Sequence, residues 1–144
     1  MSSRTCVKDV SGSTEARTGE SRRRIVLVVE DEASVRQYTA VALERLGYQV
    51  FKAANAKAAL EMVGSEELKV DLLLTDLLLP EMDGRELAKA LRDRFPRMKV
   101  LYLSGYTAAA AIRQGVLDVG SPFLQKPFEL SALTKQVRAL LGQE

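Results

Sequence analysis

The chain of 144 residues contains no histidine and only one cysteine, Cys6, and both scarcities exclude whole classes of chemistry. Without histidine, the chain cannot build a Ser-His-Asp or Cys-His catalytic group, an imidazole metal ligand or a histidine pH switch. A single cysteine allows no internal disulfide and no multi-cysteine metal site. Any chemistry must therefore use carboxylates, hydroxyls, lysine, arginine and the backbone.

Long hydrophobic runs are also missing. No segment approaches the ~20 apolar residues that a membrane-spanning helix needs, and the N-terminus has no apolar core of a secretory signal. We therefore expect a cytoplasmic protein that makes no membrane contact. A hydrophobic fraction of 47% is nevertheless too high for general disorder, so a chain of this length predicts one domain of ordinary size.

The net charge of +2 is unevenly distributed along the chain. Residues 1–24 hold six of the 21 basic and three of the 19 acidic residues, so this segment carries +3 and residues 25–144 carry −1. The segment 1–24 is rich in Ser, Thr, Gly and charge, which predicts a flexible leader or linker before a domain over 25–144. Because that domain is not basic, we expect no nucleic-acid partner.

From Ile25 onward, apolar runs typical of buried strands alternate with helical patterns. The expected strands are Ile25–Val29, Tyr48–Phe51, Val70–Thr75, Lys99–Leu103 and Pro122–Gln125. Apolar residues at helical spacing predict a first helix that ends at Gly47: Val35, Tyr38, Val41, Ala42 and Leu46. A second helix is expected between its cap Asn55 and its end at Gly64. The other expected helices are Arg85–Phe95, Thr107–Gln114 and Leu130–Leu141. Five such alternations predict right-handed βαβ crossovers and an α/β fold, with a parallel sheet covered on both faces.

Polar residues follow the expected strands: Glu30 to Glu32, Asp76, Ser104 with Gly105, and Lys126. In open α/β sheets, ligands bind at the carboxyl ends of the strands. Neighbouring carboxylates repel one another unless a cation neutralises them, and oxygen ligands without Cys or His favour Mg²⁺. A phosphoryl group fits between such a cation, a hydroxyl and a lysine, and an aspartate there can form an aspartyl-phosphate.

Four motifs, in this order and spacing, carry a resemblance to a known family: VLVVEDE at 26–32, TDLLLPEMDG at 75–84, YLSGYT at 102–107 and FLQKPF at 123–128. Over about residues 25–142, the chain resembles the receiver domain of bacterial two-component response regulators. The resemblance implies a (βα)5 flavodoxin-like, doubly wound five-stranded parallel sheet with strand order 2-1-3-4-5.

The resemblance also implies roles for individual residues. Asp76 resembles the phosphoacceptor. Glu30 and Asp31 resemble the acidic pair that holds Mg²⁺, together with Asp76 and the backbone carbonyl of Leu78. Glu30 departs from the Asp that is frequent at its position, and Glu32 is assigned to the helix start rather than to the metal.

Three further roles follow from the same likeness. Ser104 would hydrogen-bond a phosphoryl oxygen, Lys126 would pair with the phosphoryl group, and Phe123 resembles an aromatic switch coupled to the Ser104 hydroxyl. The Lys126–Pro127 bond would be cis. The bulky, non-acidic Leu78 and Tyr106 suggest slow hydrolysis of the aspartyl-phosphate.

The function that this resemblance implies is a phosphoacceptor signalling domain, not an enzyme. Its phosphodonor would be a phosphohistidine on a histidine kinase or histidine phosphotransfer protein. Because the chain ends after the last expected helix, we expect output by contact of a protein target with the surface of the fourth helix, fifth strand and fifth helix. A homodimer is left open, as is the choice between a stand-alone regulator and a receiver from a hybrid sensor histidine kinase.

Two alternatives come from other classes. Phosphatases with an aspartate nucleophile resemble one another in a second acid two residues after the nucleophile, and this chain has Leu78 at that position. A flavodoxin-like cofactor binder needs a Gly/Ser/Thr-rich phosphate loop after the first strand, where Glu30 to Glu32 would repel phosphate.

Overall fold

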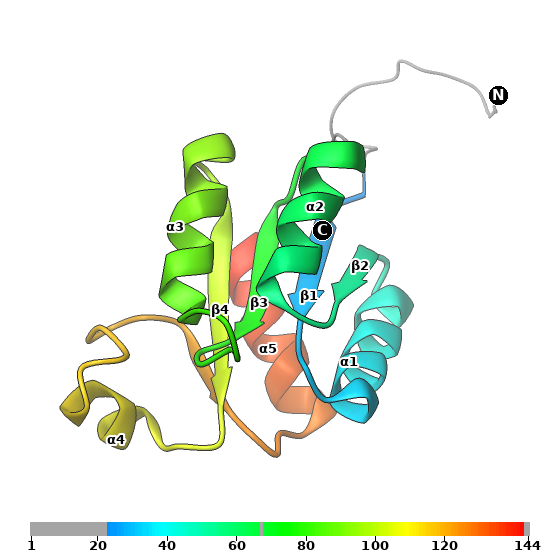
Figure 1. Cartoon of the computed structure of the whole chain (residues 1–144). Coiled ribbons are helices and arrows are strands. Elements are labelled where there is room, and N and C mark those ends of the chain that lie inside the picture. Colours follow the sequence, from blue (N-terminus) through cyan, green and yellow to red (C-terminus); the bar gives the residue numbers. More distant parts are fainter. Residues whose placement is uncertain (1–22, 67, 143–144) are drawn as a thin grey trace, which may run out of the picture.

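The computed structural model describes residues 23–66 and 68–142, so nearly all of the expected leader lies outside the described residues. Strands and helices alternate along the chain (Figure 1). In chain order they are β1 (Ile25–Val29), α1 (Ala33–Arg45), β2 (Gln49–Ala53), α2 (Ala56–Glu66), β3 (Leu72–Asp76), α3 (Gly84–Arg94), β4 (Lys99–Ser104), α4 (Ala108–Arg113), β5 (Phe123–Gln125) and α5 (Leu130–Leu141).

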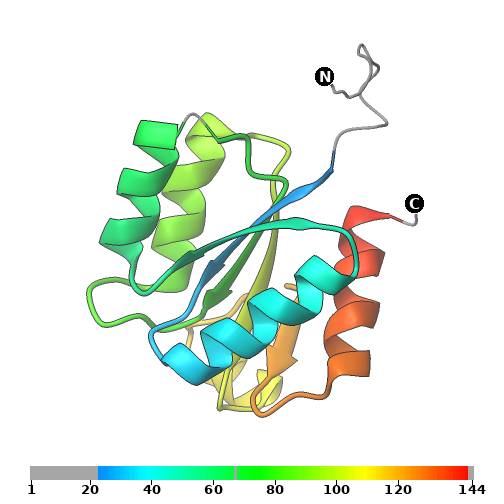
Figure 2. The same cartoon turned by 90° about the vertical axis from the view of Figure 1, so that its right-hand side faces the viewer.

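The strands form one parallel sheet in the order β2-β1-β3-β4-β5, which confirms the predicted topology. Val26 of β1 lies opposite Val50 on one side and Leu72 on the other. Figure 2 shows α2 and α3 on one face of the sheet and α1 and α5 on the opposite face. The direction of winding reverses between β1 and β3, and ligand sites of open α/β sheets lie at this position.

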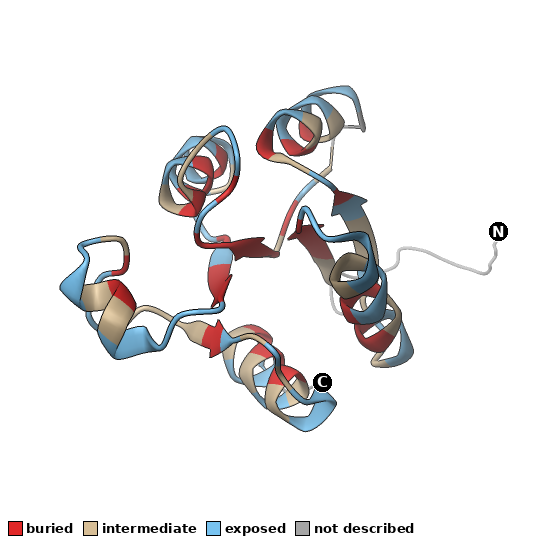
Figure 3. Ribbon diagram, turned by 60° about the horizontal axis from the view of Figure 1, so that its bottom comes forward, coloured by how far each residue is buried: buried red, intermediate tan, exposed pale blue. Residues whose placement is uncertain are grey.

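Alternate residues of each central strand belong to two separate cores. In β1, Leu27 and Val29 pack with α2 and α3, whereas Val26 and Val28 pack with α1 and α5. Figure 3 shows the buried strands surrounded by helices whose inner sides are buried and whose outer sides are exposed. Burial on both faces explains why the strands are continuous apolar runs rather than alternating ones.

The inner face of α1 differs from the predicted one. Thr39, Ala40, Ala42 and Leu43 are buried, whereas Tyr38 is 48% exposed. Small residues let the helix approach the sheet closely, and the large Tyr38 ring remains outside. The end of α1 is as predicted, because Gly47 adopts a left-handed backbone with φ 102°.

The predicted end of α2 at Gly64 is wrong, since the helix continues to Glu66. Gly64 does not have the positive φ that would end a helix. The predicted cap is confirmed: the Asn55 side chain accepts a 2.7 Å hydrogen bond from the Ala58 amide. Strand β3 begins two residues later than predicted and includes Asp76 as its last residue.

None of the described helices is both long and apolar enough to cross a membrane.

Candidate functional site

The carboxyl ends of four strands bring together residues that lie far apart in the sequence. Glu30 follows β1, Asp76 ends β3, Ser104 ends β4 and Lys126 follows β5. All strands of the sheet are parallel, so these ends meet at one edge, which faces the viewer in Figure 3. The structure therefore places the predicted polar residues around a common region.

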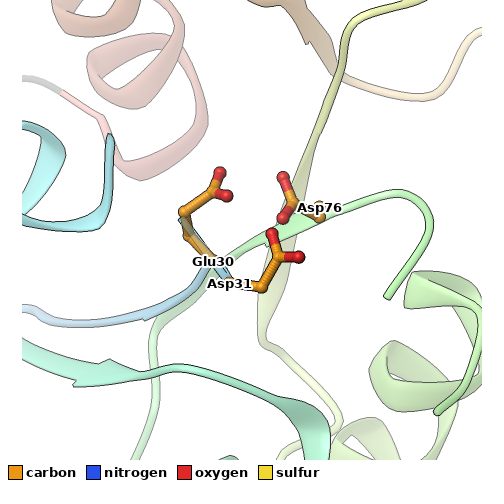
Figure 4. A group of neighbouring side chains, drawn as sticks. All are labelled: Glu30, Asp31 and Asp76. Carbon is orange, nitrogen blue, oxygen red and sulfur yellow. The ribbon is translucent and has the colours of Figure 1, made fainter. Parts of the chain in front are cut away.

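Three carboxylates converge at this edge (Figure 4). Oxygen atoms of Glu30, Asp31 and Asp76 all lie within 4.8 Å of one another. Glu30 is 0% and Asp76 4% exposed, whereas Asp31 is open to solvent. Hard oxygen ligands, crowded acids and one solvent-facing side are what a hydrated Mg²⁺ requires, so the residues present fit this ion.

Lys126 supplies the positive charge of the cluster. Its Nζ lies 3.1 Å from Oε1 of Glu30 and 2.9 Å from Oδ1 of Asp76. Burial alone would lower the pKa of Lys126, but its hydrogen bonds and charge interactions with Asp76 and Glu30 raise it, so the side chain stays charged. A backbone hydrogen bond helps to fix its position, because the Lys126 amide donates to the Ser104 carbonyl at 2.7 Å. The predicted cis Lys126–Pro127 bond is confirmed.

The Glu30 carboxyl is poised between its charged and neutral forms. Burial and the adjacent Asp76 carboxylate raise the pKa of Glu30 from 4.5 to about 7. The amide of Glu32 and the ammonium of Lys126 act in the opposite direction, because both stabilise the carboxylate. Three carboxylates thus face one lysine, and a second cation would neutralise the remaining negative charge.

An open cavity of about 450 Å³ gives access to Asp76. It is lined by Asp31, Asp76, Leu78, Leu103, Ser104, Gly105, Tyr106 and Lys126. At its rim, Leu78 is 50% and Tyr106 45% exposed. The Ser104 hydroxyl accepts a 3.0 Å hydrogen bond from the Tyr106 amide and remains able to donate to a guest.

The segment from Leu77 to Gly84 folds back against the end of β3. The Gly84 amide donates a 2.6 Å hydrogen bond to the Leu77 carbonyl, and a Cβ atom at Gly84 would collide with the Asp76 carbonyl oxygen. Asp83 shapes this return by forming a capping box with Glu86 at the start of α3. The Asp83-Gly84 pair signals the turn in the sequence, but not the close approach to Asp76.

Phe123 lies apart from the cavity lining. It is half-buried on β5, opposite Tyr102 of β4, and packs against the core formed with α2 and α3. Its carbonyl accepts a 3.3 Å hydrogen bond from Gln136 of α5. Glu32 begins α1 as its N-cap residue, as predicted.

The carboxyl edge of this doubly wound parallel sheet thus brings together three acids, a hydroxyl and a lysine around an open cavity. Residues 26–138 match the family described as the response regulator receiver domain. The chain therefore belongs to the receiver domains of two-component signalling, which generally bind Mg²⁺ at an acidic pocket and interact with histidine kinases or phosphotransfer proteins.

Named relatives agree with this membership. The chain is 38% identical over 130 residues to the sensor kinase CckA of Brucella abortus (strain 2308), covering 90% of this chain but 14% of that protein. It is 34% identical over 116 residues to the response regulator receiver protein CpdR of the same strain, covering 81% of this chain and 95% of that protein. The crystal structure of the receiver domain from hybrid histidine kinase CckA matches with a TM-score of 0.67 and 32% identity, covering 81% of this chain and 98% of that one.

Proposed function

We propose that Asp76 accepts a phosphoryl group from a phosphohistidine on a histidine kinase or histidine phosphotransfer protein. The observation that carries this proposal is the placement of Asp76, which lines an open cavity while its Oδ1 lies 2.9 Å from the Lys126 ammonium. An oxygen of the Asp76 carboxylate attacks phosphorus, the O–P bond forms, and the P–N bond to the donor imidazole breaks. The imidazole keeps the bonding electrons and takes a proton from solvent.

The other residues of the site stabilise the charge of the transferred group. The Lys126 ammonium pairs with a phosphoryl oxygen, and the Ser104 hydroxyl, which faces the same cavity, donates to another. Glu30, Asp31, Asp76 and the backbone carbonyl of Leu78 would hold Mg²⁺. When bound, Mg²⁺ neutralises phosphoryl oxygens and makes the attack of one anion on another less unfavourable.

Phosphorylation would act as a switch rather than as one step of a turnover cycle, so we propose that the chain is not an enzyme. The added charge pulls Ser104 and the loop that carries Lys126 toward the phosphoryl group, and the Phe123 side chain on β5 moves inward. These movements shift the equilibrium between two conformations of the surface formed by α4, β5 and α5, where a downstream protein target would bind. We propose neither a nucleic-acid nor a membrane partner, and a homodimer is compatible with this function.

This chemistry is compatible both with a stand-alone regulator and with a receiver domain inside a larger kinase. The likeness to a small receiver protein, CpdR, favours a stand-alone regulator, whereas the likeness to the sensor kinase CckA favours a receiver within a hybrid histidine kinase. We propose that the domain spans residues 25–144 and that it works in the cytoplasm in either setting. The segment 1–24 would be its leader or linker.

Incubation with Mg²⁺ and acetyl phosphate, followed by intact-mass measurement, tests the proposal. We expect the chain to gain one phosphoryl group in the presence of Mg²⁺, and Asp76→Asn to gain none. Asp93→Asn, a change at an exposed acid on α3, is the matched control and should label like the unsubstituted chain. Equal labelling of Asp76→Asn and the control would refute Asp76 as the acceptor.

A further inference from the structure

Arg36, in the first turn of α1, reaches back to the loop that carries two of the three site carboxylates. Its Nη1 donates a 2.8 Å hydrogen bond to the backbone carbonyl of Glu30. Arg36 is half-buried and the bond itself is partly buried, so this bond is shielded from full competition with water. It closes the β1–α1 loop from the helix side.

Glu30 is held at each of its polar groups. Its amide donates to the Ala53 carbonyl at 3.1 Å, and its carbonyl accepts from Arg36. Its carboxylate accepts from the Lys126 ammonium at 3.1 Å and from the Glu32 amide at 3.0 Å. Of these four contacts, the one from Arg36 acts on the peptide group that joins Glu30 to Asp31.

Asp31 stands in contrast to its neighbour. Its side chain is exposed, and within the part of the chain that the structure describes its carboxylate forms no hydrogen bond or ion pair. The direction in which its Cα–Cβ bond leaves the main chain is therefore set by the backbone on either side of it. That backbone is fixed before Asp31 by the Arg36 contact with the Glu30 carbonyl, and after Asp31 by the Glu32 amide on the Glu30 carboxylate.

We propose that Arg36 is a positioning residue for the cation site: by holding the Glu30 carbonyl, it keeps the Asp31 carboxylate directed toward Asp76. The role rests on the proposed binding of Mg²⁺ by these carboxylates. Residues that orient metal ligands from the second layer typically change metal affinity by about 10–100-fold when they are removed.

Loss of the Arg36 charge and loss of its positioning role would change Mg²⁺ affinity in opposite directions. A guanidinium hydrogen-bonded to the loop that carries Glu30 and Asp31 repels an incoming divalent cation, so an effect of charge alone would tighten Mg²⁺ binding when Arg36 is removed. A positioning effect weakens binding, because Asp31 then samples directions that do not face Asp76. The sign of the change separates the two explanations.

The test is a titration of the full chain with Mg²⁺. The NMR chemical shifts of the backbone amides of residues 30–32 and 76–78 report the binding. We expect Arg36→Met to weaken Mg²⁺ binding about tenfold. Arg36→Lys, which retains one donor and the charge, should recover part of this loss. Arg45→Met, which removes the same charge from the exposed end of the same helix, should bind like the unsubstituted chain.

A second readout needs no metal. The Glu32 amide, which donates to the Glu30 carboxylate, should exchange its hydrogen faster in metal-free Arg36→Met than in the unsubstituted chain, while core amides of β1 and β3 stay protected. Thermal unfolding of each variant checks that it is folded. If Arg36→Met unfolds, Arg36→Lys supplies the comparison.

The outcomes separate this role from the proposed function. Unchanged or tighter Mg²⁺ binding by a folded Arg36→Met variant would overturn the positioning role and leave the proposed function intact. Absence of Mg²⁺ binding by the unsubstituted chain would overturn both.

Discussion

The Nζ atom of Lys126 lies 2.9 Å from Oδ1 of Asp76, although the two residues are 50 positions apart and β4 separates their strands in the sheet. The lysine crosses the end of β4 to reach the aspartate, and its amide is held by the carbonyl of Ser104, the last residue of β4. A positive charge is thereby placed where the proposed reaction adds negative charge.

Replacement of Lys126 by Met should destabilise the metal-free chain. It leaves the buried carboxylates of Glu30 and Asp76 without their cation, and loss of hydrogen bonds between charged groups costs about 2 kcal/mol in the free energy of unfolding. Urea unfolding measures the loss. Saturating Mg²⁺ should restore most of it, because an ion that binds only the folded chain stabilises that state; a loss that Mg²⁺ does not reduce would contradict the shared cation site.

Replacement of Glu30 by Gln should change how stability depends on pH in the metal-free chain. Folding raises the pKa of Glu30 from 4.5 to about 7, so the folded chain binds more protons than the unfolded chain across this interval. The Glu30 contribution is therefore complete below pH 4.5 and is lost as the pH rises to about 7, with a total of about 3 kcal/mol.

Denaturant unfolding at several pH values checks this dependence. As the pH rises, the free energy of unfolding of the unsubstituted chain should fall relative to that of Glu30→Gln. A difference that stays constant across the interval would show that Glu30 keeps an ordinary pKa.

Replacement of Gly84 by Ala should displace the end of β3. The added methyl group would collide with the Asp76 carbonyl, and such overpacking costs about 1–3 kcal/mol. We also expect slower labelling by acetyl phosphate, because Asp76 moves with its backbone. Gly64→Ala is the matched control: nothing lies within 4 Å of its new methyl group, and helix propensity predicts a gain of about 0.5–1 kcal/mol. Equal stability of the two variants would contradict the close approach at Gly84.

Leu78 and Tyr106 should slow the loss of the phosphoryl group. Both are half-exposed and line the cavity above Asp76, so they limit the approach of water. Replacement of either by Ala should speed hydrolysis about threefold to tenfold, which corresponds to about 1 kcal/mol of activation free energy. Phosphate release after removal of the donor measures the rate. Leu60→Ala, at an exposed leucine on α2, should leave it unchanged; a phosphoryl group lost within seconds from the unsubstituted chain would refute the slow hydrolysis.

The sequence predicts the sheet and the grouping of polar residues at its carboxyl edge well, for a physical reason. Strands such as β1 and β3 are buried on both faces, so their apolar runs stand out, and parallel strands bring the residues that follow them to one edge. Glu30, Asp76 and Lys126 could therefore be placed together from their positions alone.

Features that depend on distances between backbones could not be predicted in this way. The buried face of α1 follows from how closely the helix approaches the sheet, which favours Ala40 and Leu43 over the large Tyr38. The contact of Gly84 with the Asp76 carbonyl and the bond from Arg36 to the Glu30 carbonyl involve main-chain atoms, for which residue types carry no signal.

Locating the phosphoryl group on the chain tests the central claim most directly. Borohydride reduces an aspartyl-phosphate to homoserine, so the chain can be labelled with acetyl phosphate and Mg²⁺, reduced, digested and sequenced by mass spectrometry. We expect homoserine at position 76 and at no other aspartate. Homoserine at Asp31 or elsewhere, or a labelled chain without homoserine at position 76, would contradict the assignment of Asp76 as the phosphoacceptor.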